Sequence, residues 1–252
     1  MIFAEGEVTR DAFLDGRLHL LQPRRGYRAA IDPVMLAAFV PAQAGQRALD
    51  LGCGVGTAAL CLAMRIARLD LHGLELQPAY AELAARNARL NNVTLNVHVG
   101  DLRAPPPALR ALSFDHVFAN PPFQRSAEGQ RPADPGRDIA HREDEASVRV
   151  WVAEGLRRLA PGGFLTFIHR AARLGEILAG LEGRAGDIEI LPIAPHSEQP
   201  AGRVLVRARK GRAGPLTLLP PLVLHERHGA NGVPAIYSRR AQDVLRARER
   251  LP

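Results

Sequence analysis

Short apolar runs, each followed by a polar or glycine-rich segment, recur along most of this chain. Most of these runs show little alternation of apolar and polar residues, which is typical of parallel strands buried on both faces. Seven such runs predict strands, at residues 48–51, 71–76, 95–99, 117–119, 164–168, 188–193 and 204–208. Nearer the amino terminus, Asp15 and Gly16 separate two further apolar stretches and predict a hairpin turn.

Helical patterns alternate with these strands. A helix is expected from about Thr57, a second at 78–90, and an amphipathic third at 143–159, in which Trp151 is predicted to be a core residue. Strands that alternate with helices are typical of an α/β fold with a parallel sheet. A length of 252 residues, without an internal repeat or a clear linker, predicts one domain over 1–252, with 1–45 as an amino-terminal extension.

A glycine-rich turn follows the strand predicted at 48–51. Gly52, Gly54 and Gly56 come directly after Asp50 and Leu51 in the spacing Gly-x-Gly-x-Gly. Glycines allow the backbone to turn tightly and to approach a ligand closely. The spacing differs from the Gly-x-Gly-x-x-Gly of dinucleotide-binding proteins, so the turn indicates a nucleotide-like cofactor without identifying it.

Acidic residues stand at the ends of three successive predicted strands. Asp50 ends the first, Glu75 lies in the second at 75 − 56 = 19 residues beyond the last glycine of the turn, and Asp101 follows the third. Sheets of this kind bind ligands at the carboxyl ends of their strands. Glu75 can accept hydrogen bonds from ribose hydroxyls, and Asp101 can accept one from an adenine amino group. Taken singly, Glu75 could equally be a solvated strand end, and Asp101 a turn or cap residue.

The most specific chemistry lies in Asn120, Pro121, Pro122 and Phe123, which follow the strand predicted at 117–119. A planar amino nitrogen is a poor nucleophile because its lone pair is delocalised into the ring. The Asn120 side-chain oxygen and the Pro121 carbonyl could accept both amino hydrogens and favour a pyramidal nitrogen, and proline adds no competing N–H. Phe123 could stack on a flat base. The motif therefore predicts methyl transfer to an amino nitrogen, and the plain alternative is a proline turn at a strand end.

From about Arg47 to Arg209 the chain resembles the Rossmann-like class I methyltransferases that use S-adenosylmethionine (SAM). The resemblance implies a doubly wound sheet of seven strands, mostly parallel, with an antiparallel last strand. It also implies that Asn120 to Phe123 receive the target nitrogen. The residues that it assigns to the cofactor in this part of the chain are Asp50, Gly52, Gly54, Glu75, Leu76, Asp101, Leu102 and Asn120.

A narrower resemblance comes from the segments 20–40, 203–210 and 221–225. They are similar to the bacterial methyltransferases that modify N6 of the adenosine beside the anticodon of valine tRNA. In that family the front segment lies beside the SAM pocket, so Tyr27, Arg28 and Asp32 are expected to bind the cofactor. Asp32 followed by Pro33 is also an ordinary helix start, with Asp as the N-cap.

The chain is basic, with a net charge of +7 and a pI near 10.5. A basic balance suits a polyanionic partner such as tRNA, although an arginine bias in the genome would give the same balance. Basic residues concentrate in three groups: Arg24, Arg25 and Arg28; Arg203, Arg207, Arg209, Lys210 and Arg212; and Arg239, Arg240, Arg246, Arg248 and Arg250. The resemblance implies that the first two groups flank the active face, and a solvated helix face is expected for the third.

Other features of the sequence bear on the cellular compartment, on metal binding and on the oligomeric state. Glu5 and Glu7 do not fit a secretory signal, and no apolar run reaches the roughly 20 residues of a membrane span. Cys53 and Cys61 are expected to be reduced thiols in a cytoplasmic protein. The nine histidines predict no metal site. The oligomeric state stays open, with a monomer favoured.

Other acceptors and another class of protein remain open. Related motifs serve enzymes that methylate ribosomal RNA guanine N2 or adenine N6, DNA bases, or the glutamine amide of release factors. A SAM-binding or RNA-binding module without catalysis would keep the fold but would not need Asn120. Residues 124–140 are rich in Gly, Pro and Arg, and they predict either a loop that orders on substrate or a plain insert.

Overall fold

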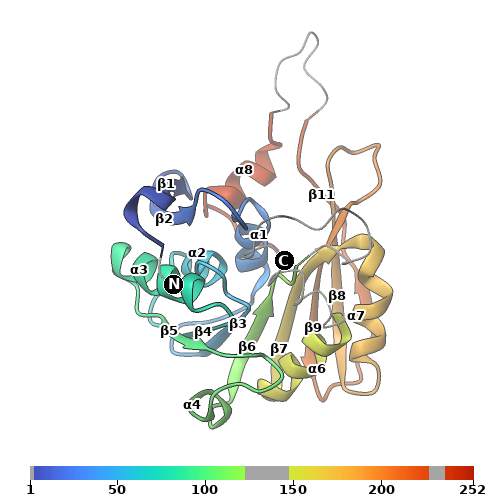
Figure 1. The fold of residues 1–252 in the computed structure, drawn as a ribbon. Helices are drawn as coiled ribbons and strands as arrows, with labels where there is room; N and C mark the ends of the chain where they lie inside the picture. Colours follow the sequence, from blue (N-terminus) through green and yellow to red (C-terminus); the bar gives the residue numbers. More distant parts are fainter. Residues whose placement is uncertain (1–2, 123–147, 227–235) are drawn as a thin grey trace, which may run out of the picture.

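The computed structural model describes residues 3–122, 148–226 and 236–252, and its centre is one twisted sheet of nine strands (Figure 1). The strand order is β10-β8-β9-β7-β6-β3-β4-β5, with β11 beside β8. The strands are β3 (Arg47–Leu51), β4 (Asp70–Glu75), β5 (Asn96–Val99), β6 (Phe114–Ala119), β7 (Leu159–Arg170), β8 (Ala185–Ala194), β9 (Arg203–Lys210), β10 (Leu216–Leu218) and β11 (Leu222–Val223). The chain order reverses beside β3, which is where sheets of this kind bind ligands.

The predicted α/β class and the antiparallel last strand are confirmed, but the number of strands is not seven. All seven predicted strands form, and β9 runs antiparallel to both β7 and β8. The two additional strands, β10 and β11, pair in parallel with β8. They have three and two residues, too few for a periodic pattern to show in the sequence. Strand β7 also begins earlier than expected, because Leu159 pairs with Phe114 across an irregularity in the register.

Helices cover both faces of the sheet. One face carries α1 (Asp32–Phe39), α2 (Thr57–Ala63), α3 (Pro78–Leu90) and α8 (Arg239–Leu245). The other face carries α6 (Val148–Arg158) and α7 (Leu174–Leu181), and α4 (Pro107–Arg110) packs near its edge. The helices predicted from Thr57 and at 78–90 are confirmed. The helix predicted at 143–159 is described from Val148 onward, because 143–147 lie outside the described residues.

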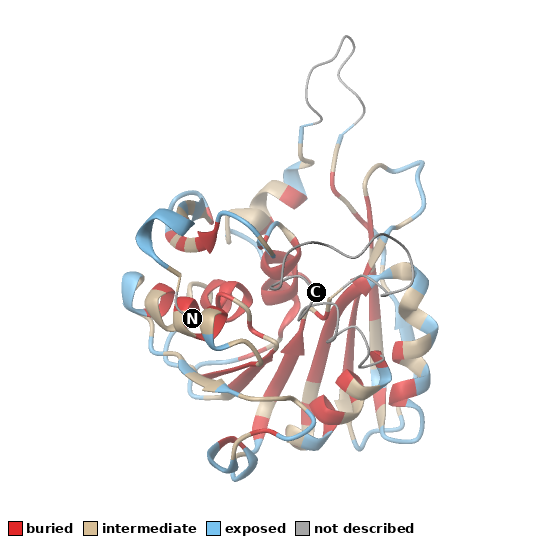
Figure 2. Cartoon of the chain, in the orientation of Figure 1, coloured by how far each residue is buried: buried red, intermediate tan, exposed pale blue. Residues whose placement is uncertain are grey.

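Two hydrophobic clusters, one on each face, hold this arrangement together. Neighbouring strand residues point to opposite faces, so Phe118 packs in the cluster under α1 and α2, while Val117 and Ala119 pack in the cluster under α6. All three are fully buried, and Figure 2 shows the same burial along the central strands. The apolar runs of the sequence are thus explained by helices on both sides of the sheet.

The amino-terminal segment forms a separate two-stranded hairpin of β1 (Val8–Phe13) and β2 (Leu18–Pro23), after a 3-10 turn at η1 (Glu5–Glu7). The predicted turn is confirmed: Asp15 and Gly16 both have positive φ, at 62° and 81°. The hairpin packs beside α3 (Figure 1), where the Asn87 side chain accepts from the Leu21 N–H at 2.7 Å and donates to the Leu21 carbonyl at 3.0 Å. This fastening places residues 24–31 beside the carboxyl ends of the strands.

Three histidines of the described strands are buried, His72, His116 and His169, and the pKa is lowered most for the last two. His116 in β6 contacts the Gln46 side-chain oxygen at 2.8 Å and stacks on Phe164, and His169 is the last but one residue of β7. Burial lowers the pKa of each from 6.5 to about 4, because desolvation disfavours the charged imidazolium. The unfolded chain takes up these protons near pH 6.5 and the folded chain only near pH 4. Their contribution to stability is therefore complete above pH 6.5 and is lost as the pH falls toward 4.

We expect the free energy of unfolding to fall by about 2 kcal/mol for each of these histidines between pH 7 and pH 5. Urea unfolding at a series of pH values measures this. In His116→Gln, which keeps a polar side chain but cannot take up the proton, the fall over the same range should be smaller by about that amount. An unchanged pH dependence in the variant would contradict the assignment to His116.

Candidate active site

A pocket of about 720 Å³, open to solvent on one side, lies at the carboxyl ends of β3, β4 and β6. Of the residues predicted for the site, those that line it are Tyr27, Asp50, Gly52, Gly54, Glu75, Asn120 and Pro122. The residues of the wall that the sequence did not single out for binding are Pro33, Cys53, Val55, Thr57, Ala58, Gln77, Tyr80 and Trp151. Three parallel strands therefore bring together residues far apart in the sequence at one edge of the sheet.

The glycine turn forms the floor of this pocket. Gly52, Gly54 and Gly56 have φ values of 67°, 55° and 84°, and residues with a Cβ rarely adopt this backbone conformation. A Cβ on Gly52 would also lie 2.6 Å from the ring of Trp151 in α6. Trp151 is buried as predicted, and it forms part of the wall as well as the core. The turn thus needs glycine both for its backbone conformation and for the close approach of the indole.

Two buried carboxyl groups face this turn. The Glu75 carboxylate accepts from the Gly54 N–H at 2.8 Å and from the Gln77 N–H at 2.9 Å. Asp50 accepts from the Ala59 N–H at 3.2 Å. Burial raises the pKa of both carboxyl groups. For Glu75 the backbone hydrogen bonds partly oppose this rise, and for Asp50 the charge of Glu75 adds to it. A ligand with positive charge would relieve this cost, so the pocket favours a cation.

Asn120 follows the end of β6 and presents an acceptor without a partner. Its Nδ2 donates to the Tyr27 hydroxyl at 3.3 Å. Its Oδ1 is buried and accepts no hydrogen bond from the described part of the chain. A buried acceptor without a partner costs about 1–3 kcal/mol, which a bound ligand with an N–H group would recover. Thr57 Oγ1, also in the wall, is a second buried atom of this kind.

Of the remaining residues of the proline motif, the structure describes Pro121 and Pro122. Pro121 is buried and does not line the pocket, whereas Pro122 does. Phe123 and the loop predicted at 124–140 lie outside the described residues. The stacking role expected for Phe123 therefore stays a prediction.

Tyr27 comes from the segment after β2, and its side chain meets that of Asn120 in the wall of the pocket. Its backbone N–H donates to the Tyr80 hydroxyl at 3.1 Å. The residue is 48% exposed, yet burial of its hydroxyl end raises the pKa of that group, with Asp32 and Asp50 adding to the rise. The hydroxyl therefore stays protonated and uncharged over the physiological pH range.

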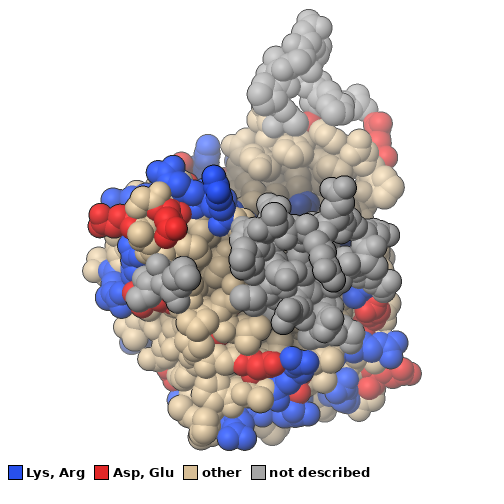
Figure 3. Space-filling view, viewed as in Figure 1, with Lys and Arg blue, Asp and Glu red and all other residues tan. Residues whose placement is uncertain are grey.

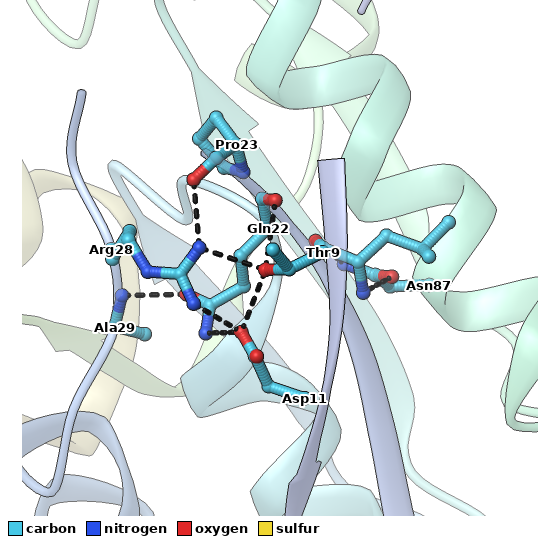
Figure 4. Close-up of polar contacts among 8 residues, drawn as sticks. Thr9, Asp11, Gln22, Pro23, Arg28, Ala29 and Asn87 are labelled. Atoms are coloured by element: carbon cyan, nitrogen blue, oxygen red, sulfur yellow. Dashed lines mark hydrogen bonds and ion pairs between the residues drawn. The ribbon is translucent and has the colours of Figure 1, made fainter. Parts of the chain in front are cut away.

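Two residues predicted to bind the cofactor, Arg28 and Asp32, have partners within the chain, and their assignment to the cofactor stays a prediction. Arg28 pairs with Asp11 of the hairpin at 2.6 Å and does not line the pocket (Figure 4). Asp32 is the first residue of α1 and pairs with Arg203 at 2.9 Å. The interpretation of Asp32 as an N-cap is wrong, because Ile31 occupies the cap position and no side chain caps the helix. Both residues lie next to the pocket without forming its wall.

The residues predicted to flank the adenine also lie outside this wall. The Asp101 carboxylate is held by Arg103 at 2.7 Å, and this contact lowers the pKa of Asp101. Neither Leu76 nor Leu102 lines the pocket. Their assignment to a cofactor stays a prediction.

The second basic group does not flank the site as a unit. Strand β9 is antiparallel, so Arg203 pairs with Arg170 at the carboxyl end of β7, while Arg209 pairs with Phe164 in the middle of that strand. Arg207 is buried against Glu189 and Phe39, and Lys210 donates to the Leu159 carbonyl at 2.7 Å. Only Arg203 of this group reaches the edge that carries the pocket. The sequence could not show this, because residues spread along one strand run from one end of the neighbouring strands toward the other.

Neither a metal cluster nor a membrane span is found in the described parts of the chain. Within 3–122, 148–226 and 236–252, no group of three or more His, Cys, Asp or Glu side chains could hold a metal ion. Over the same residues, no helix has the length and apolar character needed to cross a bilayer.

Residues 31–178 match the protein family described as "Methyltransferase small domain". A relative from Porphyromonas gingivalis, named tRNA1(Val) (adenine(37)-N6)-methyltransferase, is 28% identical over 178 residues, which are 68% of this chain and 69% of that protein.

Solved structures show the same architecture. The crystal structure of a predicted O-methyltransferase from Agrobacterium tumefaciens is 26% identical, with a TM-score of 0.70 over 87% of this chain and 98% of that one. A T. thermophilus 16S rRNA N2 methyltransferase, crystallised with AdoMet and guanosine, is 20% identical and has a TM-score of 0.54 over 81% of this chain and 50% of that one. At this identity the second match shows a shared fold.

We expect Gly52→Ala to weaken the binding of S-adenosylhomocysteine by at least about tenfold, because the new methyl group meets Trp151 and the backbone is strained, a cost of about 1–3 kcal/mol. Isothermal titration calorimetry measures this. Gly175→Ala in α7 is the matched control, since its methyl group would have no atom within 4 Å. Equal affinity in Gly52→Ala and wild type would show that the turn does not shape the binding site.

Proposed function

The chain belongs to the methyltransferase small domain family, and we propose that it transfers a methyl group from SAM to the N6 amino group of an adenosine in tRNA, beside the anticodon of valine tRNA. The observation that carries the proposal is Oδ1 of Asn120 in the wall of the pocket, which is buried and accepts no hydrogen bond from residues 3–122, 148–226 or 236–252. An amino group is the donor that this acceptor lacks. The relative from P. gingivalis, named for this reaction, supports the choice of base and RNA.

The pocket fits SAM in the charges that line it. SAM carries a positive sulfonium and an ammonium group, and the buried Asp50 and Glu75 are placed to compensate such charges. Each Glu75 oxygen has a second lone pair beyond its backbone hydrogen bond, and these lone pairs can accept the ribose hydroxyls. Bound there, SAM would supply a methyl group made electrophilic by the positive sulfur.

Asn120 acts on the acceptor nitrogen in this scheme. Its Oδ1 accepts one amino hydrogen, which directs the nitrogen lone pair toward the methyl carbon. The Pro121 carbonyl would accept the other once it is turned toward the pocket, whose wall Pro121 does not form in this structure. With SAM bound, the new N–C bond would form as the C–S bond breaks, and the electron pair of the broken bond would leave with sulfur as S-adenosylhomocysteine. The nitrogen then loses one proton to solvent, because an amide oxygen is too weak a base to keep it. Asn120 is therefore a catalytic residue that works by positioning and by hydrogen bonding.

The remaining cofactor residues and the setting belong to the same proposal. Asp101 and Leu102 would flank the adenine of SAM, and Leu76 would lie beside the ribose, once the Asp101 carboxylate exchanges its contact with Arg103 for the ligand. Phe123 would stack on the target base. The substrate is a nucleotide of a single-stranded loop, which costs little to extrude, and the reaction takes place in the cytoplasm, with the protein acting as a monomer.

We expect Asn120→Ala to lower the rate of methyl transfer to tRNA by about a hundredfold or more while leaving the affinity for S-adenosylhomocysteine unchanged, because the oxygen acts on the acceptor. The assay uses labelled SAM and unmodified tRNA, followed by nucleoside analysis for N6-methyladenosine.

Ribosomal RNA and protein are offered in parallel lanes of that assay. Label in one of them, with none in tRNA, would move the acceptor and leave the chemistry of Asn120 in place. Equal rates for Asn120→Ala and wild type would overturn its catalytic role.

Arg25 provides a test of the tRNA interface. It is exposed on the segment between the hairpin and Tyr27, in the region where Figure 3 shows basic side chains around the hairpin. We expect Arg25→Ala to raise the KM for tRNA and to reduce the slope of log affinity against log salt by about one, as the loss of one phosphate contact does.

Arg212→Ala is the matched control for Arg25→Ala, because Arg212 is equally exposed but follows β9 at the opposite edge of the sheet. Its salt slope should match that of the wild type. Equal slopes in the two variants would show that the contact is not specific to the edge with the pocket.

A further inference from the structure

We propose that Tyr27 is a positioning residue for Asn120: its hydroxyl holds the Nδ2 end of the amide so that Oδ1 faces the acceptor, and the amino-terminal hairpin fixes the segment that carries Tyr27. This goes beyond a contact of Tyr27 with the cofactor. It rests on the proposed function, because Asn120 is taken as the residue that receives the amino group.

The orientation of the Asn120 amide decides whether it helps or hinders. With Oδ1 toward the acceptor, the amide accepts an amino hydrogen. Turned by 180°, it would present Nδ2, a donor facing a donor. The hydrogen bond from Nδ2 to the Tyr27 hydroxyl at 3.3 Å is the contact that distinguishes the two orientations, since Oδ1 has no partner among the described residues.

Tyr27 has to accept from Asn120 for the amide to face the acceptor in this way. A hydroxyl can donate or accept, so the direction of this hydrogen bond matters. In the structure the hydroxyl accepts from Nδ2 of Asn120 at 3.3 Å. The amide is therefore held by its nitrogen end, and its oxygen is left for the acceptor.

Residues 28 and 29, which follow Tyr27 directly, are tied to the hairpin (Figure 4). The Arg28 guanidinium donates to the Asp11 carboxylate at 2.6 Å, to the Thr9 hydroxyl at 2.8 Å and to the Pro23 carbonyl at 2.9 Å. The Ala29 N–H donates to the Gln22 side-chain oxygen at 2.7 Å. The backbone around Tyr27 is therefore held on a two-stranded frame and not on a free loop.

The hairpin frame is in turn joined to the glycine turn. Gln22 is 2% exposed, and its Nε2 donates to Asp11 at 2.7 Å, which links the two strands. Asn87 of α3 is fully buried and bonds to both Leu21 of the hairpin and the Val55 carbonyl of the turn, the latter at 2.9 Å. One connected set of hydrogen bonds thus relates the turn, the hairpin, Tyr27 and Asn120. Such support of a reacting group by locked neighbours is what precise positioning requires.

The test is Tyr27→Phe, which removes the hydroxyl and keeps the ring. The ring lies beside the glycine turn, since its Cε1 would be 3.8 Å from a Cβ on Gly54. We expect the kcat of methyl transfer to fall about tenfold to a hundredfold, as a misplaced catalytic group does, with the KM for SAM and the affinity for S-adenosylhomocysteine unchanged. Adding Tyr27→Phe to Asn120→Ala should cause no further loss, because Tyr27 acts through Asn120. Tyr237→Phe, the same change at a tyrosine outside the pocket wall, is the control and should keep the wild-type kcat.

A second measurement needs no acceptor. In the ¹H–¹⁵N spectrum, the side-chain NH₂ pair of Asn120 is assigned by its loss in Asn120→Ala. We expect this pair to shift, and to exchange with solvent faster, in Tyr27→Phe but not in Tyr237→Phe. In Asp11→Asn, which weakens the hold on Arg28 from outside the pocket, the same signal should shift in the same direction by a smaller amount.

The outcomes separate this inference from the proposed function. If tRNA is not labelled but ribosomal RNA or protein is, the proposed acceptor fails, and the kcat comparison is made with the labelled one. An unchanged Asn120 signal and an unchanged kcat in Tyr27→Phe would overturn the positioning role. Weaker S-adenosylhomocysteine binding at unchanged kcat would also overturn it, since Tyr27 would then serve only the cofactor.

Discussion

The buried carboxylate of Glu75 is the contact on which the site depends. One oxygen holds the N–H of Gly54 in the turn after β3, and the other holds the N–H of Gln77 after its own strand. Two neighbouring loops are therefore fixed to each other through one side chain in a low-dielectric setting, where such bonds are strong. Because the turn is fixed, Gly52 can pack under Trp151, and Asp50 lies at the base of the pocket. Lone pairs left on Glu75 can still serve a ligand.

The site is assembled from two parts that are held in place by different kinds of hydrogen bond. The sheet provides Asp50, Glu75 and Asn120 at the ends of three adjacent parallel strands, where backbone pairing fixes their positions. The segment after the hairpin, which is outside that sheet, provides Tyr27, and it is held to the hairpin largely by hydrogen bonds of side chains. A fold shared with other methyltransferases can thus keep the reacting groups on the sheet, while the amino-terminal hairpin and the segment after it orient the amide of Asn120.

Much of the fold was accessible from sequence because it follows from local pattern. The seven apolar runs gave strands, 78–90 gave α3, and Asp15-Gly16 gave the hairpin turn. The strands β10 and β11 were missed, since two or three residues carry no period and are held only by pairing with β8. The basic residues of β9 were misplaced as a group, because the direction of the strand, and not the spacing of its arginines, decides which of them reach the pocket.

The sequence by itself determined the chemistry of the site: the glycine turn, Asp50, Glu75 and Asn120 are recognisable because each stands directly after or within an apolar strand. Only the tertiary structure decided which neighbours complete it. Trp151 and Tyr80 enter the wall from helices, Arg28 turns to Asp11, and Asp32 pairs with Arg203. These contacts join residues distant in the chain, and no local period encodes them. They depend on how helices and a hairpin pack against a completed sheet, which is a property of the whole chain.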